Sequence, residues 1–160
     1  QNRGTMEDEK DSPGVIAMPP VIVGAFLIAG LVLEYLFSWP QLAQSAQYIA
    51  GGVLIAASGL LMPGILLRFR RASTHLDVRK ATSAIITDGP YRVSRNPIYV
   101  SLMLLYFGIG LMVDGVWIII LAAPLAMVIH HGVILREERY LEKKFGEEYL
   151  TYKRAVRRWI

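Results

Sequence analysis

The chain has 160 residues, of which 54% are hydrophobic and 19% charged, and its formal net charge is +4. Its mean hydropathy is +0.40, and soluble domains carry about 25% charged residues, so the composition argues against an ordinary soluble domain. The chain contains no cysteine, which excludes disulfides, thiolate metal ligands and cysteine nucleophiles.

The N-terminal residues 1–14 are polar and mixed in charge, which predicts a disordered tail ahead of a single membrane domain over residues 15–160. Gln1–Thr5 precedes Met6 and is expected to be the remnant of an expression tag.

Four apolar segments are each close to the length of about 20 residues that a membrane-spanning helix needs. They cover approximately residues 19–37, 46–67, 97–113 and 116–135. The first is too long, and its flank too acidic, for a cleaved signal peptide. Glu34, near the end of this segment, is interpreted as a carboxylate at the membrane interface. Asp114–Gly115 is expected to form a short turn between the last two spans.

The second span carries small residues at a four-residue spacing. Its predicted contact face consists of Gly52, Ala56, Leu60 and Gly64, with Ala57 and Gly59 beside them. Small residues let helices approach closely in lipid, so we interpret this face as a helix–helix contact rather than a ligand groove.

The polar connector over residues 68–95 ends at the third span. Gly89–Pro90 indicates a tight turn, and Asn96 followed by Pro97 is typical of a helix start, where the Asn side chain caps free backbone amides. Such a start suits an anionic group, and Arg95 beside it could receive a carboxylate.

After the fourth span, apolar residues recur every three or four positions. They are Leu141, Phe145, Tyr149, Tyr152, Val156 and Trp159. This stripe predicts amphipathic helices over about residues 136–159 that lie on the membrane surface, with a break at Gly146.

Basic residues fall on one side of the predicted membrane. The N-terminal tail has two, the connector seven and the C-terminal tail eight, whereas the two outer turns have none. The positive-inside rule therefore places both termini in the cytoplasm. The predicted fold class is an all-α integral membrane four-helix bundle with cytoplasmic C-terminal amphipathic helices. The basic excess follows from this topology and from anionic lipid, not from nucleic-acid binding.

Candidate chemistry lies on the same side. Glu137 and Glu138 follow the fourth span, and adjacent residues on a helix point about 100° apart, so one can face the bundle while the other faces water. The alternative is a solvated start to a charged helix. A structural or interfacial role is favoured for His130 and His131, and no metal site is predicted. The motifs of nucleotidases, serine hydrolases and zinc proteases are absent.

The chain resembles the isoprenylcysteine carboxyl methyltransferase family, whose wider group includes membrane phospholipid methyltransferases. The resemblance rests on Gly89–Tyr99 (GPYRVSRNPIY), Arg136–Glu138 (REE) and Phe145–Tyr149 (FGEEY), followed by Tyr152 and Val156. It implies an integral membrane enzyme that transfers a methyl group from S-adenosylmethionine to a lipophilic acceptor drawn from the membrane, without an obligatory protein partner.

The resemblance also implies the site residues. The cofactor would be bound by Ser83, Ala84, Ile85, Ile86, Gly89, Tyr91, Arg95, Asn96, Pro97, Ile98, Tyr99 and Glu137. Arg136 and Glu138 are the predicted catalytic residues.

Two positions depart from the family pattern. Asn96 replaces a His found in many members, and Val133 stands where those enzymes carry an Arg that faces the substrate carboxylate. An amine or thiol acceptor, including a phospholipid headgroup, is therefore an alternative to a prenylcysteine carboxylate. Two further alternatives are an NADPH-dependent enzyme similar to sterol reductases and a non-enzymatic membrane scaffold.

Overall fold

The computed structural model describes residues 13–37, 39, 45–72 and 84–160. Its helices, in chain order, are α2 (Pro19–Leu36), α3 (Ser45–Arg71), the 3-10 helix η1 (Gly89–Arg92), α4 (Pro97–Met112), α5 (Val116–Ile129), the π-helix η2 (His130–Ile134), α6 (Leu135–Phe145) and α7 (Glu147–Ala155). No strand occurs among the described residues. The all-α prediction is therefore confirmed for this part of the chain.

Three of the described helices are long and apolar enough to cross a membrane. They are Pro19–Leu36, Ser45–Arg71 and the continuous helix Val116–Phe145, with mean hydropathies of 1.9, 2.0 and 2.3. α4 is equally apolar in character but has only 16 residues. At about 1.5 Å per residue it measures roughly 24 Å, less than the hydrocarbon core of about 30 Å. The four-span prediction is thus confirmed by length for three helices, and α4 is a shorter fourth.

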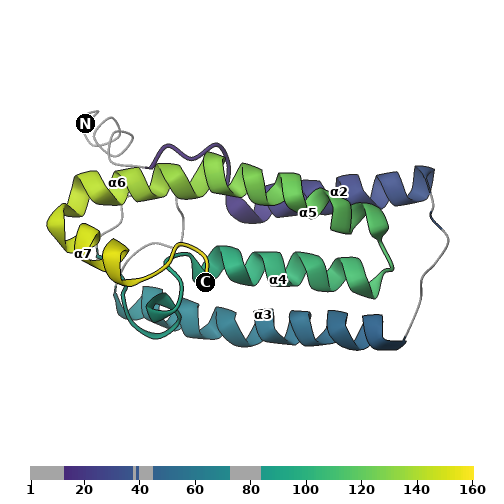
Figure 1. Cartoon of the computed structure of the whole chain (residues 1–160), viewed down its shortest axis with the longest axis horizontal. Coiled ribbons are helices and arrows are strands. Elements are labelled where there is room, and N and C mark those ends of the chain that lie inside the picture. The colour runs from purple at the N-terminus through teal and green to yellow at the C-terminus, as the bar shows by residue number, and fades with distance from the viewer. Residues whose placement is uncertain (1–12, 38, 40–44, 73–83) are drawn as a thin grey trace, which may run out of the picture.

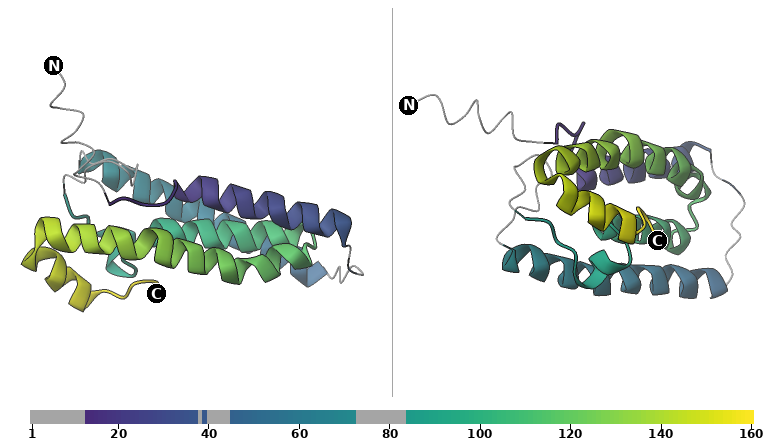
Figure 2. Two further views of the ribbon diagram at one scale, coloured as in Figure 1. Left: turned by 90° about the horizontal axis from the view of Figure 1, so that it is seen from above. Right: turned by 60° about the vertical axis from the view of Figure 1, so that its left-hand side comes forward.

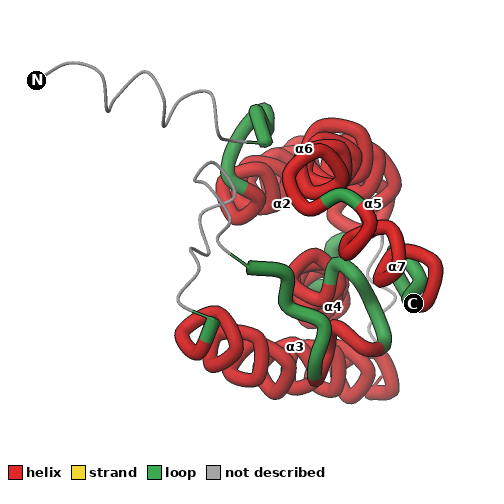
Figure 3. Tube along the Cα trace, turned by 90° about the vertical axis from the view of Figure 1, so that its left-hand side faces the viewer, coloured by secondary structure: helices red, strands yellow, loops and turns green. Residues whose placement is uncertain are grey.

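The helices run side by side along the long axis of the molecule (Figure 1). α2 packs against α5, α5 against α4, and α4 against α3, as the end-on view also shows (Figure 3). α3 and the α5–α6 helix extend beyond the first residue of α4 at one end of the bundle (Figure 1). The segment over residues 84–96, α7 and the C-terminal residues occupy this end.

The fourth span and the first C-terminal helix form one continuous helix, Val116–Phe145. α5 continues through the π-helix into α6 without interruption, and the chain turns at Gly146, which has a φ of 56°. α7 then folds back, and the C-terminus lies near the start of α4 (Figure 2). The predicted break at Gly146 is confirmed. The chain can turn here because glycine adopts this left-handed conformation without a Cβ penalty.

The C-terminal apolar stripe packs on the protein. Tyr149 and Tyr152 form a buried cluster with Ile65 and Tyr91, against which Phe145 and other stripe residues pack. The apolar side of this stripe therefore faces α3 and the 84–96 segment rather than lipid, and the position of these helices at the membrane surface stays a prediction.

The contact between α3 and α4 uses a different face of α3 from the predicted one. A Cβ on Gly51 would lie 2.9 Å from the backbone oxygen of Gly108, whereas Gly52 faces open space and Leu60 is 81% exposed. The buried Ser58 hydroxyl donates to the Ser101 carbonyl at 2.8 Å. The close approach was predicted correctly, but its register was wrong, because small residues occur all around α3.

The two ends of α2 and α5 meet through polar contacts. The Trp117 backbone N–H donates to Glu34 Oε2 at 3.1 Å, and the Trp117 indole donates to the Phe37 carbonyl at 2.9 Å. Glu34 therefore accepts a hydrogen bond from a backbone amide in the first turn of α5, which has no partner within the helix. The Asp114–Gly115 turn precedes this helix as predicted.

Candidate active site

The start of α4 is held by the C-terminal residues rather than by its own cap. Asn96 occupies the N-cap position, but its side chain makes no capping hydrogen bond; Nδ2 donates instead to the Arg158 carbonyl at 2.9 Å. The backbone N–H of Asn96 donates to Ser94 Oγ at 3.0 Å. The predicted capping role of the Asn96 side chain is therefore wrong: this side chain joins two segments far apart in sequence.

The first carboxylate of the acidic pair faces the start of α4. The Tyr99 hydroxyl donates to Glu137 Oε2 at 2.7 Å. Tyr99 is buried in the first turn of α4, and Glu137 is half-buried in α6. The connector and the acidic pair thus meet, as the sequence led us to expect.

The second carboxylate lies in a buried group of charges. Glu138 is only 4% exposed. Its two oxygens accept hydrogen bonds from Arg158 Nε and Nη2, both at 2.9 Å. Arg95 Nη1 lies 3.2 Å from Glu138 Oε1. Such a bidentate arginine–carboxylate pair is among the strongest charge-assisted contacts in proteins.

Arg95 is the least satisfied member of this group. Its side chain is 7% exposed. Within the described part of the chain, its Nε and Nη1 atoms have no hydrogen-bond partner. Buried polar groups are nearly always hydrogen-bonded, so these donors mark a place where an anion would be stabilised.

Three tyrosines surround these charges. Burial raises the pKa of Tyr91, and the negative charge of Glu137 adds to the effect. Burial also raises the pKa of Tyr149, an effect that Glu138 strengthens and Arg95 opposes. The Tyr152 hydroxyl, its pKa raised by burial, donates to the Tyr91 carbonyl at 2.7 Å. All three hydroxyls therefore stay protonated at neutral pH.

Gly89 is packed against an arginine of α3. It has a φ of 58°, and a Cβ there would lie 2.0 Å from Arg68 Cζ. Arg68 Nε donates to Asp88 Oδ2 at 3.1 Å. These contacts explain why a glycine stands at this turn, while its predicted contact with a cofactor stays a prediction.

The remaining predicted residues are spread around the site. Ile85 and Ile86 pack against the cluster of Tyr91 and Tyr149, and Ile98 packs against both apolar clusters. Pro97 is buried in the first turn of α4, and Ala84 is half-buried. Ser83 lies outside the described residues.

Arg136 lies on the outer side of α6. Its exposed guanidinium donates to the Gly14 carbonyl at 2.8 Å. This placement directs it toward the N-terminal segment and away from the Tyr99–Glu137 pair, so its catalytic role stays a prediction that the geometry does not favour.

Sequence reasoning missed Arg158 and Ser94. Arg158 is one of eight basic residues in the C-terminal tail, and nothing in the spacing distinguishes it from its neighbours. Only the return of the chain to the start of α4 brings it to Glu138.

An apolar groove lies beside this site. It has a volume of about 290 Å³ and is lined by Val100, Met103, Leu104, Phe107, Ala126, Trp159 and Ile160. α4 and α5 form its walls, and the residues that follow Arg158 complete its lining. Trp159, which lines the groove, directly follows Arg158 of the charged group in the chain.

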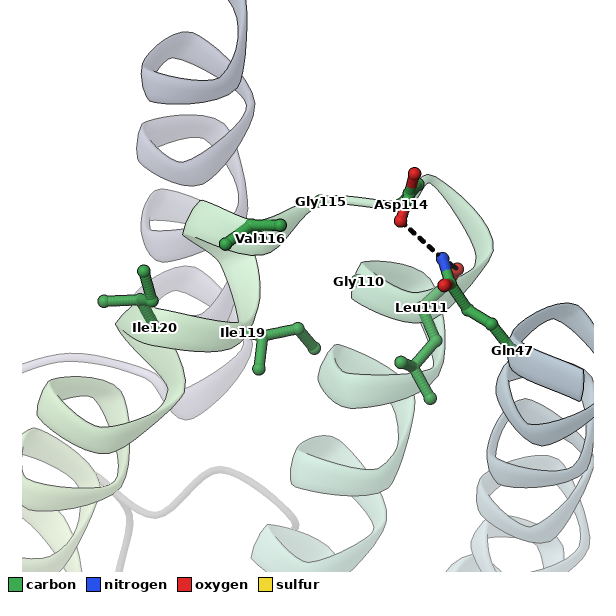
Figure 4. A pocket seen from close by; sticks show the side chains of 8 residues that line it. All are labelled: Gln47, Gly110, Leu111, Asp114, Gly115, Val116, Ile119 and Ile120. Carbon is green, nitrogen blue, oxygen red and sulfur yellow. Dashed lines mark hydrogen bonds between the residues drawn. The ribbon is translucent and has the colours of Figure 1, made fainter. Parts of the chain in front are cut away.

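A second pocket, of about 270 Å³, lies at the α4–α5 turn, at the other end of the bundle (Figure 4). Gln47 Nε2 donates there to Asp114 Oδ1 at 2.7 Å and to the Leu111 carbonyl at 3.0 Å. This pocket is separated from the acidic pair by the length of α4.

Comparison with known proteins identifies the family. A profile described as phospholipid methyltransferase matches residues 46–148, more than half of the chain. The chain belongs to the phospholipid methyltransferase family. In this family member the matched range runs from the start of α3 into the first turn of α7, and it contains Arg95, Tyr99 and both glutamates. Its membership and its apolar helices indicate an integral membrane protein.

Three curated relatives are similar to parts of the chain. An uncharacterized protein of Haemophilus influenzae is 47% identical over 68 residues, which are 39% of this chain and 98% of that protein. The cobalt-zinc-cadmium resistance protein CzcN of Cupriavidus metallidurans is 28% identical over 96 residues, 60% of this chain and 40% of that protein. Protein-S-isoprenylcysteine O-methyltransferase of Rattus norvegicus is 31% identical over 136 residues, 78% of this chain and 44% of that protein.

This phospholipid methyltransferase family member thus spans less than half the length of the last two relatives. No solved structure shows a significant match to it.

Proposed function

We propose that this protein transfers a methyl group from S-adenosylmethionine to a lipophilic acceptor at the cytoplasmic face of a membrane. The observation that carries the proposal is the pairing of two opposite charges at one site. Arg95 Nε and Nη1, which make no hydrogen bond within the described residues, suit a carboxylate, and Glu137 suits an ammonium or hydroxyl group. S-adenosylmethionine presents all of these groups, and family membership supports it as the methyl donor.

The protein's own residues would bind the methyl donor and orient it toward the acceptor. S-adenosylmethionine would supply a methyl group activated by its sulfonium. Arg95 would hold the carboxylate, and Glu137, oriented by the Tyr99 hydroxyl, would hold a donor group of the same molecule. Alignment of donor and acceptor can account for about 7–11 kcal/mol of a barrier, so binding and orientation by these residues suit this reaction.

The apolar groove supports a lipophilic acceptor. Its lining residues come from α4, α5 and the C-terminus, so a hydrocarbon chain there would lie within the apolar layer with its polar end toward Tyr99 and Glu137. Val133 is fully buried and brings no charge to the acceptor. This favours an amine or thiol, including a phospholipid headgroup, over a carboxylate.

Calorimetric titration of the detergent-solubilised protein tests the donor. We expect S-adenosylmethionine to bind and NADPH not to bind. Binding of NADPH alone would support the reductase alternative, and binding of neither a scaffold. Transfer of a radiolabelled methyl group into a total lipid extract, followed by identification of the product, then tests the acceptor.

Glu137→Gln tests the site. It should weaken S-adenosylmethionine binding about tenfold or more, because a hydrogen bond to a charged group contributes about 1.5–3 kcal/mol, and it should leave the helical content unchanged. Glu148→Gln is the matched control, since Glu148 is exposed on α7. Equal affinities of Glu137→Gln and the parent protein would remove Glu137 from the site.

A further inference from the structure

Two arginines share the buried carboxylate of Glu138. Two arginines, Arg95 and Arg158, surround one carboxylate that is 4% exposed. Burial of an unpaired charge is costly. Glu138 therefore cannot pair fully with both arginines, and the observed hydrogen bonds show which of the two it pairs with.

Arg158 takes the carboxylate. It donates to both oxygens of Glu138 at 2.9 Å, and this hydrogen bond raises the pKa of Arg158. Arg95 approaches Oε1 only to 3.2 Å, and its Nε and Nη1 make no hydrogen bond within the described residues. The arginine left without a full partner is thus the one on the connector, beside Tyr149 and the start of α4.

The backbone of the C-terminal segment fixes this arrangement. The Arg95 N–H donates to the Arg157 carbonyl at 2.9 Å, and Asn96 Nδ2 donates to the Arg158 carbonyl at 2.9 Å. Trp159 packs against the main apolar core. These contacts hold the C-terminal segment against residues 95 and 96. They therefore place the Arg158 side chain beside Glu138 and next to Arg95. The C-terminal segment lies beyond residues 46–148, which the family profile matches.

We propose that Arg158 is a positioning residue for the methyl-donor site. By occupying both oxygens of Glu138, it prevents Glu138 from pairing fully with Arg95, and Arg95 stays available for the carboxylate of S-adenosylmethionine. This inference rests on the proposed function. Without Arg158, Glu138 would form a bidentate pair with Arg95 and neutralise the charge of Arg95.

The test compares three forms of the full-length protein in detergent by calorimetric titration with S-adenosylmethionine. Arg158→Gln should weaken binding about 10- to 100-fold, the range for loss of a charge-assisted hydrogen bond. The double variant Glu138→Gln/Arg158→Gln should bind more tightly than Arg158→Gln alone, because no carboxylate remains to capture Arg95. Arg154→Gln, which removes an exposed arginine of α7, is the control and should bind like the parent.

A second ligand separates positioning from a general structural role. Decarboxylated S-adenosylmethionine lacks the group that Arg95 would bind, so its affinity should be the same for Arg158→Gln and the parent protein. A merely structural role of Arg158 would weaken both ligands and would not be rescued by the double variant.

The outcomes are distinguishable. Failure of the parent protein to bind S-adenosylmethionine would overturn the proposed function. If the parent binds S-adenosylmethionine and Arg158→Gln binds it equally well, the role of Arg158 is overturned while the proposed function stands. The same holds if the double variant binds as weakly as Arg158→Gln. If Arg158→Gln does not fold, the double variant is compared with Glu138→Gln: the two must bind S-adenosylmethionine equally for the inference to stand, because Arg158 acts through Glu138.

Discussion

At the scale of single residues, partners distant in sequence decide what each polar side chain does. Asn96 has the sequence signature of a helix cap, yet its side chain donates to the Arg158 carbonyl. Glu138 was expected to serve catalysis, and the structure pairs it with Arg158. Glu137, which meets Tyr99, is the carboxylate of the pair whose contacts suit a ligand.

Asn96→Asp distinguishes the two roles of this side chain. Aspartate caps helices about as well as asparagine, but it has no donor for the Arg158 carbonyl. Because that carbonyl would face a carboxylate, we expect a loss of about 1–3 kcal/mol in unfolding free energy, measured by thermal unfolding in detergent.

Asn96→Ala serves as the comparison, since it lacks both functions. An Asp variant as stable as the parent protein, with only the Ala variant destabilised, would restore the capping interpretation.

At the scale of elements, helix existence follows from apolar runs, while the face that each helix buries depends on its neighbour. The four predicted apolar segments correspond to α2, α3, α4 and α5 within a few residues at most ends. The contact face of α3 was predicted at Gly52 and found at Gly51. In the C-terminal region, the amphipathic period predicted helices correctly but assigned their apolar side to lipid instead of to Ile65 and Tyr91.

Gly51 and Gly52 offer a matched pair for this contact. Gly51→Leu should reduce the unfolding free energy by about 1–3 kcal/mol through overpacking against the backbone of Gly108. Gly52→Leu should change stability little, because a side chain there meets open space. Thermal unfolding of both variants in the same detergent measures the difference; equal losses would mean that α3 packs in another register.

At the scale of the whole molecule, the fold brings together segments that are far apart in the chain. Arg95 and Tyr99 lie at the start of α4, and the C-terminal segment brings Arg158 to the same glutamate pair on α6. Because α4 is shorter than α3 and the α5–α6 helix, the bundle end has room for the 84–96 segment and α7.

The orientation of the bundle is predicted by the distribution of its basic residues. The absence of native cysteine allows a direct test with single substitutions. Arg154→Cys should react with a membrane-impermeant maleimide only after the cytoplasmic side is opened. Val113→Cys, half exposed near the α4–α5 turn, should react from outside in intact cells. The reverse labelling pattern would invert the topology and place the proposed site on the outer face.

The sequence by itself determined the membrane class, the approximate spans and the residues of the Gly89–Tyr99 and Arg136–Glu138 segments, because apolar length and local turn chemistry act over a few neighbouring residues. Only the tertiary structure decided which face of α3 is buried, that Asn96 binds the Arg158 carbonyl, and that Arg158 rather than Arg95 pairs fully with Glu138. The first outcome depends on how α4 packs on α3, and the last two depend on where α7 returns the chain; no periodicity encodes the meeting of two side chains separated by tens of residues. The sequence therefore supplied the candidate groups, and the fold assigned each its partner.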